Sequence, residues 1–144
     1  MITVSDILAF VESVAPPSYQ MSWDNTGLLC GRKDKEVRTV LVALDPFTSV
    51  CQEAVQLGAD LLVTHHPLIF QPVTSVTDQT TVGKAVMTLI RNDIAPSMHT
   101  PIWTAHREVS MIFWPSGWVL RIFLSLAASI CCGQVATIAL CRIF

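Results

Sequence analysis

The sequence predicts an α/β fold with a mainly parallel sheet flanked by helices, and two observations support this prediction. Short apolar runs typical of buried strands alternate with longer segments whose apolar residues recur at helical spacing. Polar residues typical of binding sites, namely Asp45, His65, His66 and His99, stand at or just after the ends of the predicted strands. Because helical crossovers make such strands parallel, these residues should meet at one edge of the sheet, where open α/β sheets bind ligands.

The first predicted element is an amphipathic helix that begins near Ser5 and ends before Pro16 and Pro17. Serine is a favourable N-cap because its hydroxyl oxygen accepts a hydrogen bond from a free N–H of the first turn. Proline ends a helix because it lacks an N–H and clashes with the preceding turn. The apolar face of the helix consists of Ile7, Leu8, Val11 and Val14.

A strand–helix–strand unit is predicted next. Residues 38–45, RTVLVALD, have the composition of a buried strand. Thr48 is predicted to cap the following helix, and Gly58 is predicted to end it. Residues 60–67, DLLVTHHP, form the next predicted strand and its end.

A second helical crossover completes the predicted sheet. Residues 81–94, TVGKAVMTLIRNDI, have helical spacing, and a short strand that ends near His99 follows them. Two consecutive crossovers predict that the three strands run parallel.

Composition excludes some functions and favours others. The 144 residues suit one domain with a sizeable core, but not comfortably two. A net charge of −2 argues against a nucleic-acid partner. Asp6 and Glu12 stand where a secretory leader would be apolar, so we expect a cytoplasmic protein. The five cysteines show no CxxC spacing, which indicates reduced packing residues.

The composition changes near residue 100. Ten of the eleven acidic residues lie in residues 1–100, whereas three of the four tryptophans lie in residues 101–144. We therefore predict a partial α/β domain over residues 1–100 and a different, apolar tail after it. Residues 122–140 have no charge over about the length of a membrane helix, so a tail anchor is an alternative. Four polar side chains and Gly133 argue against membrane association.

The strongest chemical signal is the pair His65 and His66, which is followed by Pro67. Adjacent side chains on a regular strand point to opposite faces, but at a strand end both imidazoles can reach one cleft. Each histidine could bind one of two adjacent ions of the zinc, iron, manganese or nickel class. The alternative is that one histidine is exposed and the other bonds a backbone carbonyl.

Three further polar residues have two interpretations each. Asp24 and Asn25, in the segment SWDNTGLLCG, either bond the local backbone of a turn or also line the cleft. Asp45, beside Pro46, is either a residue at the start of the next helix or a site residue.

Four segments together resemble a known family: SWDNTGLLCG, VLVALD, GADLLVTHHPLIF and MHT. In this order and at these separations they resemble the NGG-interacting-factor-three-like family, also called GTP cyclohydrolase I type 2 homologues or dinuclear metal centre proteins. The resemblance covers residues 1–100. It implies an α/β fold, a ring-shaped homohexamer and a site for two divalent metal ions, with His65 and His66 as ligands. The family name also implies a nucleotide substrate, GTP, whose guanine ring is opened by hydrolysis.

The chain departs from the family pattern at Pro101, Ile102 and Trp103, where the family has Asn-Leu-Asp and the aspartate binds the metals. A displaced reading frame explains the departure. In a frame displaced by two nucleotides, the last base of each codon joins the first two bases of the next codon. Trp and Met each have only one codon, so the residue encoded at the junction after each of them is determined in several places. The junction after Trp103 must give aspartate, and the junctions after Met111, Trp114 and Trp118 must give aspartate, alanine and glycine. With permitted codons elsewhere the stretch becomes NLDSAPGGVNDILA, which resembles the family's continuation.

These observations predict a family member by descent that is inactive as this polypeptide, because Trp103 stands at the position of a metal ligand. No catalytic residue can be assigned. The alternatives are a non-enzymatic, hexamer-forming interaction protein and, less favoured, a tail-anchored membrane protein.

Overall fold

The computed structural model describes residues 1–14, 16, 18, 20–98 and 137–140. His99 and Trp103 therefore lie outside the described residues. The elements follow the chain in this order: α1 (Val4–Val14), β1 (Gly27–Leu28), β2 (Thr39–Ala43), α2 (Thr48–Gln56), β3 (Leu61–Thr64), α3 (Thr81–Arg91), β4 (Ala95–Met98) and β5 (Thr137–Leu140).

The strands form one sheet in the order β1-β4-β3-β2-β5. Strands β5, β2, β3 and β4 run parallel to one another, and β1 pairs with β4 in the antiparallel direction. The predicted α/β fold with a mainly parallel sheet is thus confirmed. Strand β1 was not predicted, since two residues show no periodicity, and β5 lies in the predicted apolar tail.

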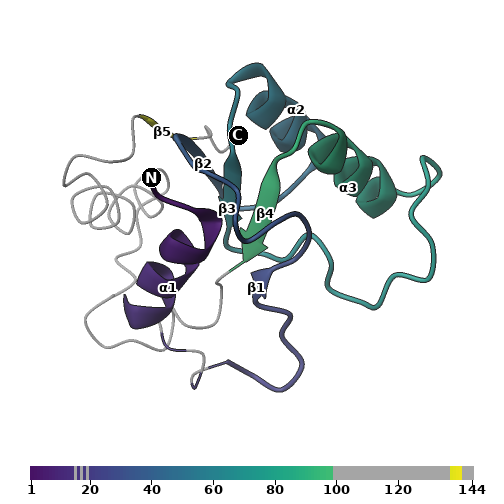
Figure 1. Ribbon diagram of the computed structural model, residues 1–144. Coiled ribbons are helices and arrows are strands. Elements are labelled where there is room, and N and C mark those ends of the chain that lie inside the picture. The colour runs from purple at the N-terminus through teal and green to yellow at the C-terminus, as the bar shows by residue number, and fades with distance from the viewer. Residues whose placement is uncertain (15, 17, 19, 99–136, 141–144) are drawn as a thin grey trace, which may run out of the picture.

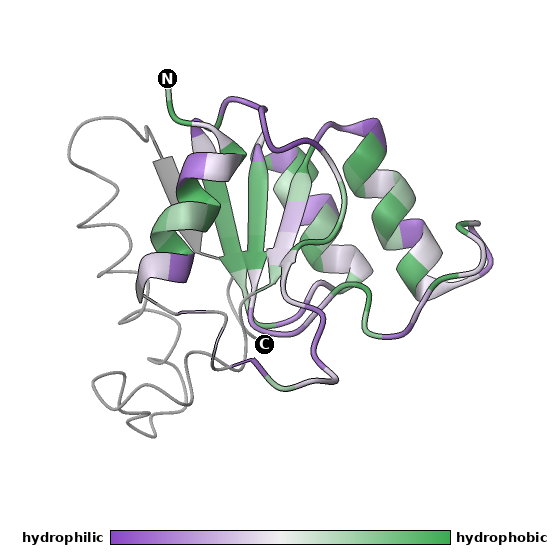
Figure 2. Cartoon of the chain, turned by 60° about the horizontal axis from the view of Figure 1, so that its bottom comes forward, coloured by the Kyte–Doolittle hydropathy of each residue, from purple (hydrophilic) through white to green (hydrophobic). Residues whose placement is uncertain are grey.

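The sheet is covered by helices on both faces, with α1 on one and α2 and α3 on the other (Figure 1). Successive side chains of a strand point to opposite faces, so Val40 and Val42 pack with α1, whereas Leu41 and Ala43 pack on the side of α2 and α3. Figure 2 shows the central strands as largely hydrophobic between helices that carry both polar and apolar residues. This pattern is expected of a parallel sheet buried on both faces.

Helix α1 has a different cap from the predicted one. Ser5 lies within its first turn, and Thr3 is the capping residue. The N–H of Asp6 donates to Thr3 Oγ1 at 3.3 Å, and the N–H of Thr3 donates to Asp6 Oδ2 at 2.8 Å. This reciprocal pair is a capping box. The prediction of Ser5 is wrong because backbone pairing of the preceding residues sets where the helix begins.

The caps of α2 and α3 also test the sequence analysis. The N-cap of α2 is Phe47, without a side-chain hydrogen bond, so the prediction that Thr48 caps this helix is wrong. Gly58 follows the helix with φ +61°, and its N–H donates to the carbonyl oxygen of Val55, as a terminating glycine does. In α3, Thr80 Oγ1 accepts the N–H of Gly83 at 3.0 Å.

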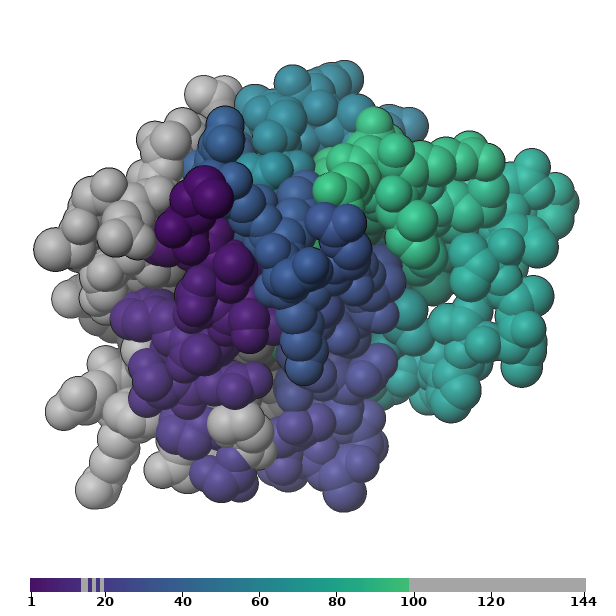
Figure 3. Space-filling model, viewed as in Figure 1, coloured from purple at the N-terminus to yellow at the C-terminus, as the bar shows by residue number. Residues whose placement is uncertain are grey.

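The N-terminal segment is paired with the residues that precede β2. Thr3 bridges Glu36, the N–H of Val4 donates to the oxygen of Lys35, and the N–H of Val37 donates to the oxygen of Ile2. Figure 3 shows the purple N-terminal segment directly beside this blue segment. The pairing holds α1 against its face of the sheet.

An ion pair joins the starts of β2 and β3. Lys35 Nζ lies 3.3 Å from Asp60 Oδ1, and Asp60 Oδ2 accepts the N–H groups of Arg38 and Thr39. Burial raises the pKa of Asp60, but these hydrogen bonds and Lys35 outweigh burial, so the pKa is lowered overall. These contacts stabilise the edge of the sheet at which β2 and β3 begin. The candidate site lies at the opposite edge, where the two strands end.

No helix in the described part of the chain is long and apolar enough to cross a membrane. The tail anchor considered for residues 122–140 lies outside the described residues, except for its last four, which form β5.

Candidate metal centre

The candidate site lies where β2 and β3 end side by side. The two strands pair in parallel up to Ala43 and Thr64. Backbone bonding continues beyond these residues, since the N–H of His65 donates to the oxygen of Ala43 at 3.3 Å and the N–H of His66 to that of Leu44 at 3.0 Å. The continued pairing brings Asp45 and His66 to the same level.

Asp45 contacts His66 directly. Its Oδ1 lies 2.6 Å from His66 Nδ1, the length of a strong hydrogen bond to a charged group. The side chain of Asp45 is 27% exposed and that of His66 is 50% exposed. Asp45 therefore contacts one of the two histidines, and it is not the N-cap of α2, which is Phe47.

His65 and His66 lie against each other with ring centroids 4.8 Å apart, edge to face. Burial lowers the pKa of His65, the neighbouring His66 lowers it further, and Asp45 acts in the opposite direction. The folded protein thus favours the neutral form of His65, which is the form that binds metals.

Thr64 contributes to the site in a way that the sequence analysis missed. Its buried hydroxyl donates to the backbone oxygen of His66 at 2.7 Å and lies 3.4 Å from the oxygen of Ser97 in β4. This contact fixes the backbone between the two histidines and the turn at Pro67. A threonine hydroxyl two residues before a turn could have indicated such a bond.

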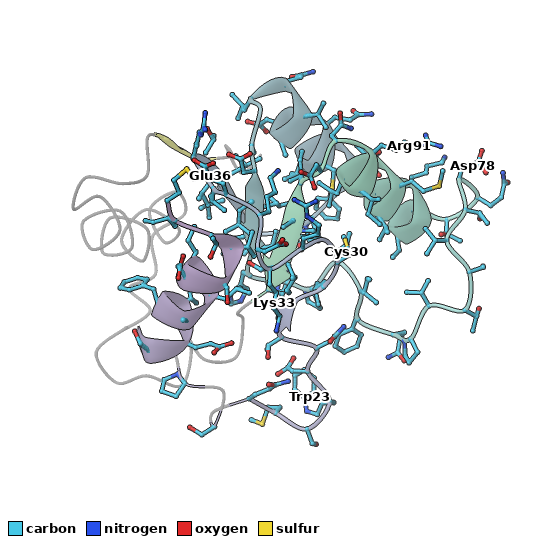
Figure 4. All side chains as sticks on the ribbon, in the orientation of Figure 1. Trp23, Cys30, Lys33, Glu36, Asp78 and Arg91 are labelled. Atoms are coloured by element: carbon cyan, nitrogen blue, oxygen red, sulfur yellow. The ribbon has the colours of Figure 1, made fainter. Side chains whose placement is uncertain are left out.

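The WDN segment contacts the loop that follows the histidines. Asn25 Nδ2 donates to the backbone oxygen of Ile69 at 2.7 Å, so it bonds a distant segment and not the local turn. Trp23 and Phe70 pack edge to face with centroids 6.2 Å apart, and Figure 4 labels Trp23 in the loop before β1. Asp24 lies in a turn closed by its own N–H, which donates to the oxygen of Met21. Among the described residues, no hydrogen bond or ion pair joins Asp24 or Asn25 to the histidines themselves.

Two imidazoles at one edge fit part of a metal site. A bound metal usually takes three or four protein ligands. Within the ranges that the structure describes, no group of three His, Cys, Asp or Glu side chains is placed to hold a metal. His65 and His66 fit the nitrogen ligands of such a site, and any further ligands would come from outside these residues. The predicted site residues His99 and Trp103 are among the residues not described.

The fold and the site define a class: an α/β protein with paired histidines where its parallel strands end. The chain belongs to the Duf34/NIF3 (NGG1p interacting factor 3) family, whose model matches residues 2–113. This match confirms the resemblance found in the motifs and extends past residue 100, where the motifs end.

Two relatives of known sequence share one description. A "GTP cyclohydrolase 1 type 2 homolog" from Streptomyces coelicolor is 44% identical over 108 residues, which are 74% of this chain and 38% of that protein. A protein of the same description from Clostridium perfringens is 38% identical over 91 residues, 63% of this chain and 35% of its own length. The chain thus spans little more than a third of these relatives.

Solved structures share the fold. The Bacillus cereus protein related to NIF3 is 38% identical with a TM-score of 0.66, and the match covers 69% of this chain and 28% of that one. Reduced HcgD from Methanocaldococcus jannaschii is 36% identical with a TM-score of 0.63, over 67% of this chain and 39% of that one.

Proposed function

We propose that the chain descends from dinuclear-metal hydrolases of the GTP cyclohydrolase I type 2 kind and that it is catalytically inactive as this polypeptide. The class of function rests on one observation: His65 and His66 contact each other where β3 ends, and Asp45 bonds one of them. The description of the relatives as GTP cyclohydrolase 1 type 2 homologues supports a nucleotide substrate.

In the proposed ancestral site His65 and His66 hold two divalent ions of the zinc, iron, manganese or nickel class. When bound, these metals supply Lewis-acid activation of water for hydrolysis. The protein's own part is to present neutral imidazole nitrogens, and burial of His65 supports that role because it lowers the pKa of this residue. From the family resemblance, the proposal also includes assembly into a ring-shaped homohexamer.

The proposed inactivity rests on Trp103, which stands where the family pattern has an aspartate. An indole cannot replace a carboxylate as a ligand, because its N–H only donates hydrogen bonds. With two imidazoles and no carboxylate, a two-metal site falls short of the usual ligand number.

Elemental analysis of the purified chain tests the proposal. We expect well below two equivalents of tightly bound metal per chain and no turnover of GTP when metal is added. The matched control is the His65→Ala/His66→Ala double variant, which measures metal bound elsewhere on the chain. Two equivalents that persist through dialysis and disappear in the double variant would contradict the proposed inactivity.

A non-enzymatic assembly role is the second candidate, and the exposed aromatic pair favours it. The side chains of Trp23 and Phe70 pack together although they are 64% and 49% exposed. Large exposed aromatic groups are typical of protein contacts. If the pair serves self-association, Trp23→Ala should reduce the mass measured by light scattering, whereas His65→Ala/His66→Ala should leave it unchanged. An unchanged mass in Trp23→Ala would contradict this role of the pair.

A further inference from the structure

We propose that Asp45 is a positioning residue that holds His66 in its Nδ1–H tautomer, so that the Nε2 lone pair is the one available to a ligand. The inference rests on the proposed function for its purpose, but its geometry stands on the described residues alone. Asp45 then orients His66, whereas His65 has no such partner among the described residues.

The hydrogen bond determines the tautomer. Asp45 Oδ1 lies 2.6 Å from His66 Nδ1. An ionised carboxylate only accepts hydrogen bonds, so the hydrogen must be on Nδ1, and a neutral ring then has its lone pair on Nε2. Histidines that bind metals commonly donate their other N–H to a carboxylate, which fixes the tautomer and the ring orientation.

The backbone of two strands builds this pair. The parallel pairing of Ala43 with Thr64 and the bond from the N–H of His66 to the oxygen of Leu44 set Asp45 and His66 at the same level. The Thr64 hydroxyl then bonds the backbone oxygen of His66. Asp45 and His66 both follow paired strands. The ring of His66 is therefore fixed at two points, by the hydrogen bonds of its backbone and by the hydrogen bond between Nδ1 and Asp45.

His65 differs from His66 in this respect. Its ring packs against that of His66, but among the described residues no hydrogen bond orients it. The side chain of His66 is also half exposed. A partly exposed pair of this kind adds little to stability, and its removal should leave the fold intact.

Nuclear magnetic resonance of the ¹⁵N-labelled full chain without metal tests the inference. Long-range ¹H–¹⁵N spectra, recorded where both imidazoles are neutral, distinguish the two tautomers. We expect His66 to be mainly Nδ1–H in the wild type and mainly Nε2–H in Asp45→Ala. Asp78→Ala, which removes an exposed carboxylate near the α3 end of the loop between β3 and α3, is the matched control and should change nothing. The inference is overturned if wild-type His66 is mainly Nε2–H, or if its tautomer is the same in Asp45→Ala while circular dichroism shows that the variant is folded.

Titration with Zn²⁺ separates this inference from the proposed function. Asp45→Ala should weaken Zn²⁺ binding about 10- to 100-fold, the usual effect of losing such a carboxylate, and Asp78→Ala should not. Equal binding by the wild type and Asp45→Ala, abolished in His65→Ala/His66→Ala, would show that Asp45 does not position the ligand. If the tautomer depends on Asp45 but the histidines bind no Zn²⁺ in any variant, the positioning of His66 is supported and the loss of the metal agrees with the proposed inactivity. Turnover of GTP by the wild-type chain would contradict the proposed function and leave the positioning of His66 untouched.

Discussion

Restoring the displaced reading frame after Thr100 should convert the chain from a weak into a tight metal binder. In the displaced frame, permitted codons read Asn-Leu-Asp in place of Pro101, Ile102 and Trp103, and the aspartate is the residue that the codons force. With the proposed ligands His65 and His66, the restored aspartate would give the three protein ligands that open metal sites commonly use. We expect a gain of about 4 kcal/mol in binding free energy, which is about a 10³-fold lower Kd.

Competition with a chelator of known affinity measures this gain, with Zn²⁺ and Mn²⁺ as probes. The matched control is the same frame-restored chain with asparagine in place of the restored aspartate, which keeps the tail and removes the charge. Tight binding by the aspartate chain alone supports the loss of a ligand at Trp103. If both restored chains bind as weakly as the present one, the proposed ligand position is wrong.

The coding DNA from Ile94 to Trp103 tests the frame itself. A one- or two-base change that restores Asn-Leu-Asp would explain why the composition and the family pattern change near residue 100. The same reading frame in related strains would contradict a frameshift, whatever the metal affinity of the restored chain.

Much of the fold could be predicted because its signals are local. The apolar runs of β2 and β3 and the helical spacing of α3 each lie within one segment, and Gly58 ends α2 through its own backbone conformation. The caps were harder because a cap depends on where the preceding chain is held. Pairing of Thr3 with Glu36 places the start of α1, which no pattern around Ser5 reveals.

The candidate site was predictable to the same extent. The rule that parallel strands end at one edge brought Asp45, His65 and His66 together before any contact was known. It could not say that Asp45 bonds Nδ1 of His66 in particular. The sequence also does not predict the hydrogen bond from Asn25 to Ile69. The two residues are 44 positions apart, and no pattern in either segment indicates that the two segments contact each other.

Gly83→Ala should destabilise the folded protein, although alanine is the better helix former. A Cβ built on Gly83 would overlap the backbone oxygen of Thr77 and lie 2.9 Å from its nitrogen and 2.8 Å from Thr80 Oγ1. Such overpacking costs about 1–3 kcal/mol. Displacement of Thr80 would also weaken its cap of α3, which costs about 1 kcal/mol.

Helix propensity acts in the opposite direction, since alanine is favoured over glycine within a helix by about 1 kcal/mol. The steric cost exceeds this gain because its main partner is backbone, which cannot rotate away as a side chain can. We therefore expect the free energy of unfolding to fall by about 1–3 kcal/mol, measured by urea denaturation.

Gly58→Ala is the matched control, because Gly58 has φ +61° but no atom within 4 Å of a built Cβ. It should show only the conformational cost of a left-handed alanine, about 1–2 kcal/mol. If Gly83→Ala proves as stable as the wild type, the loop at Thr77 must be able to move away from α3. The loop after the histidines would then be held by the buried Leu68 and by the contacts of Ile69 and Phe70 with Asn25 and Trp23, and not at the start of this helix.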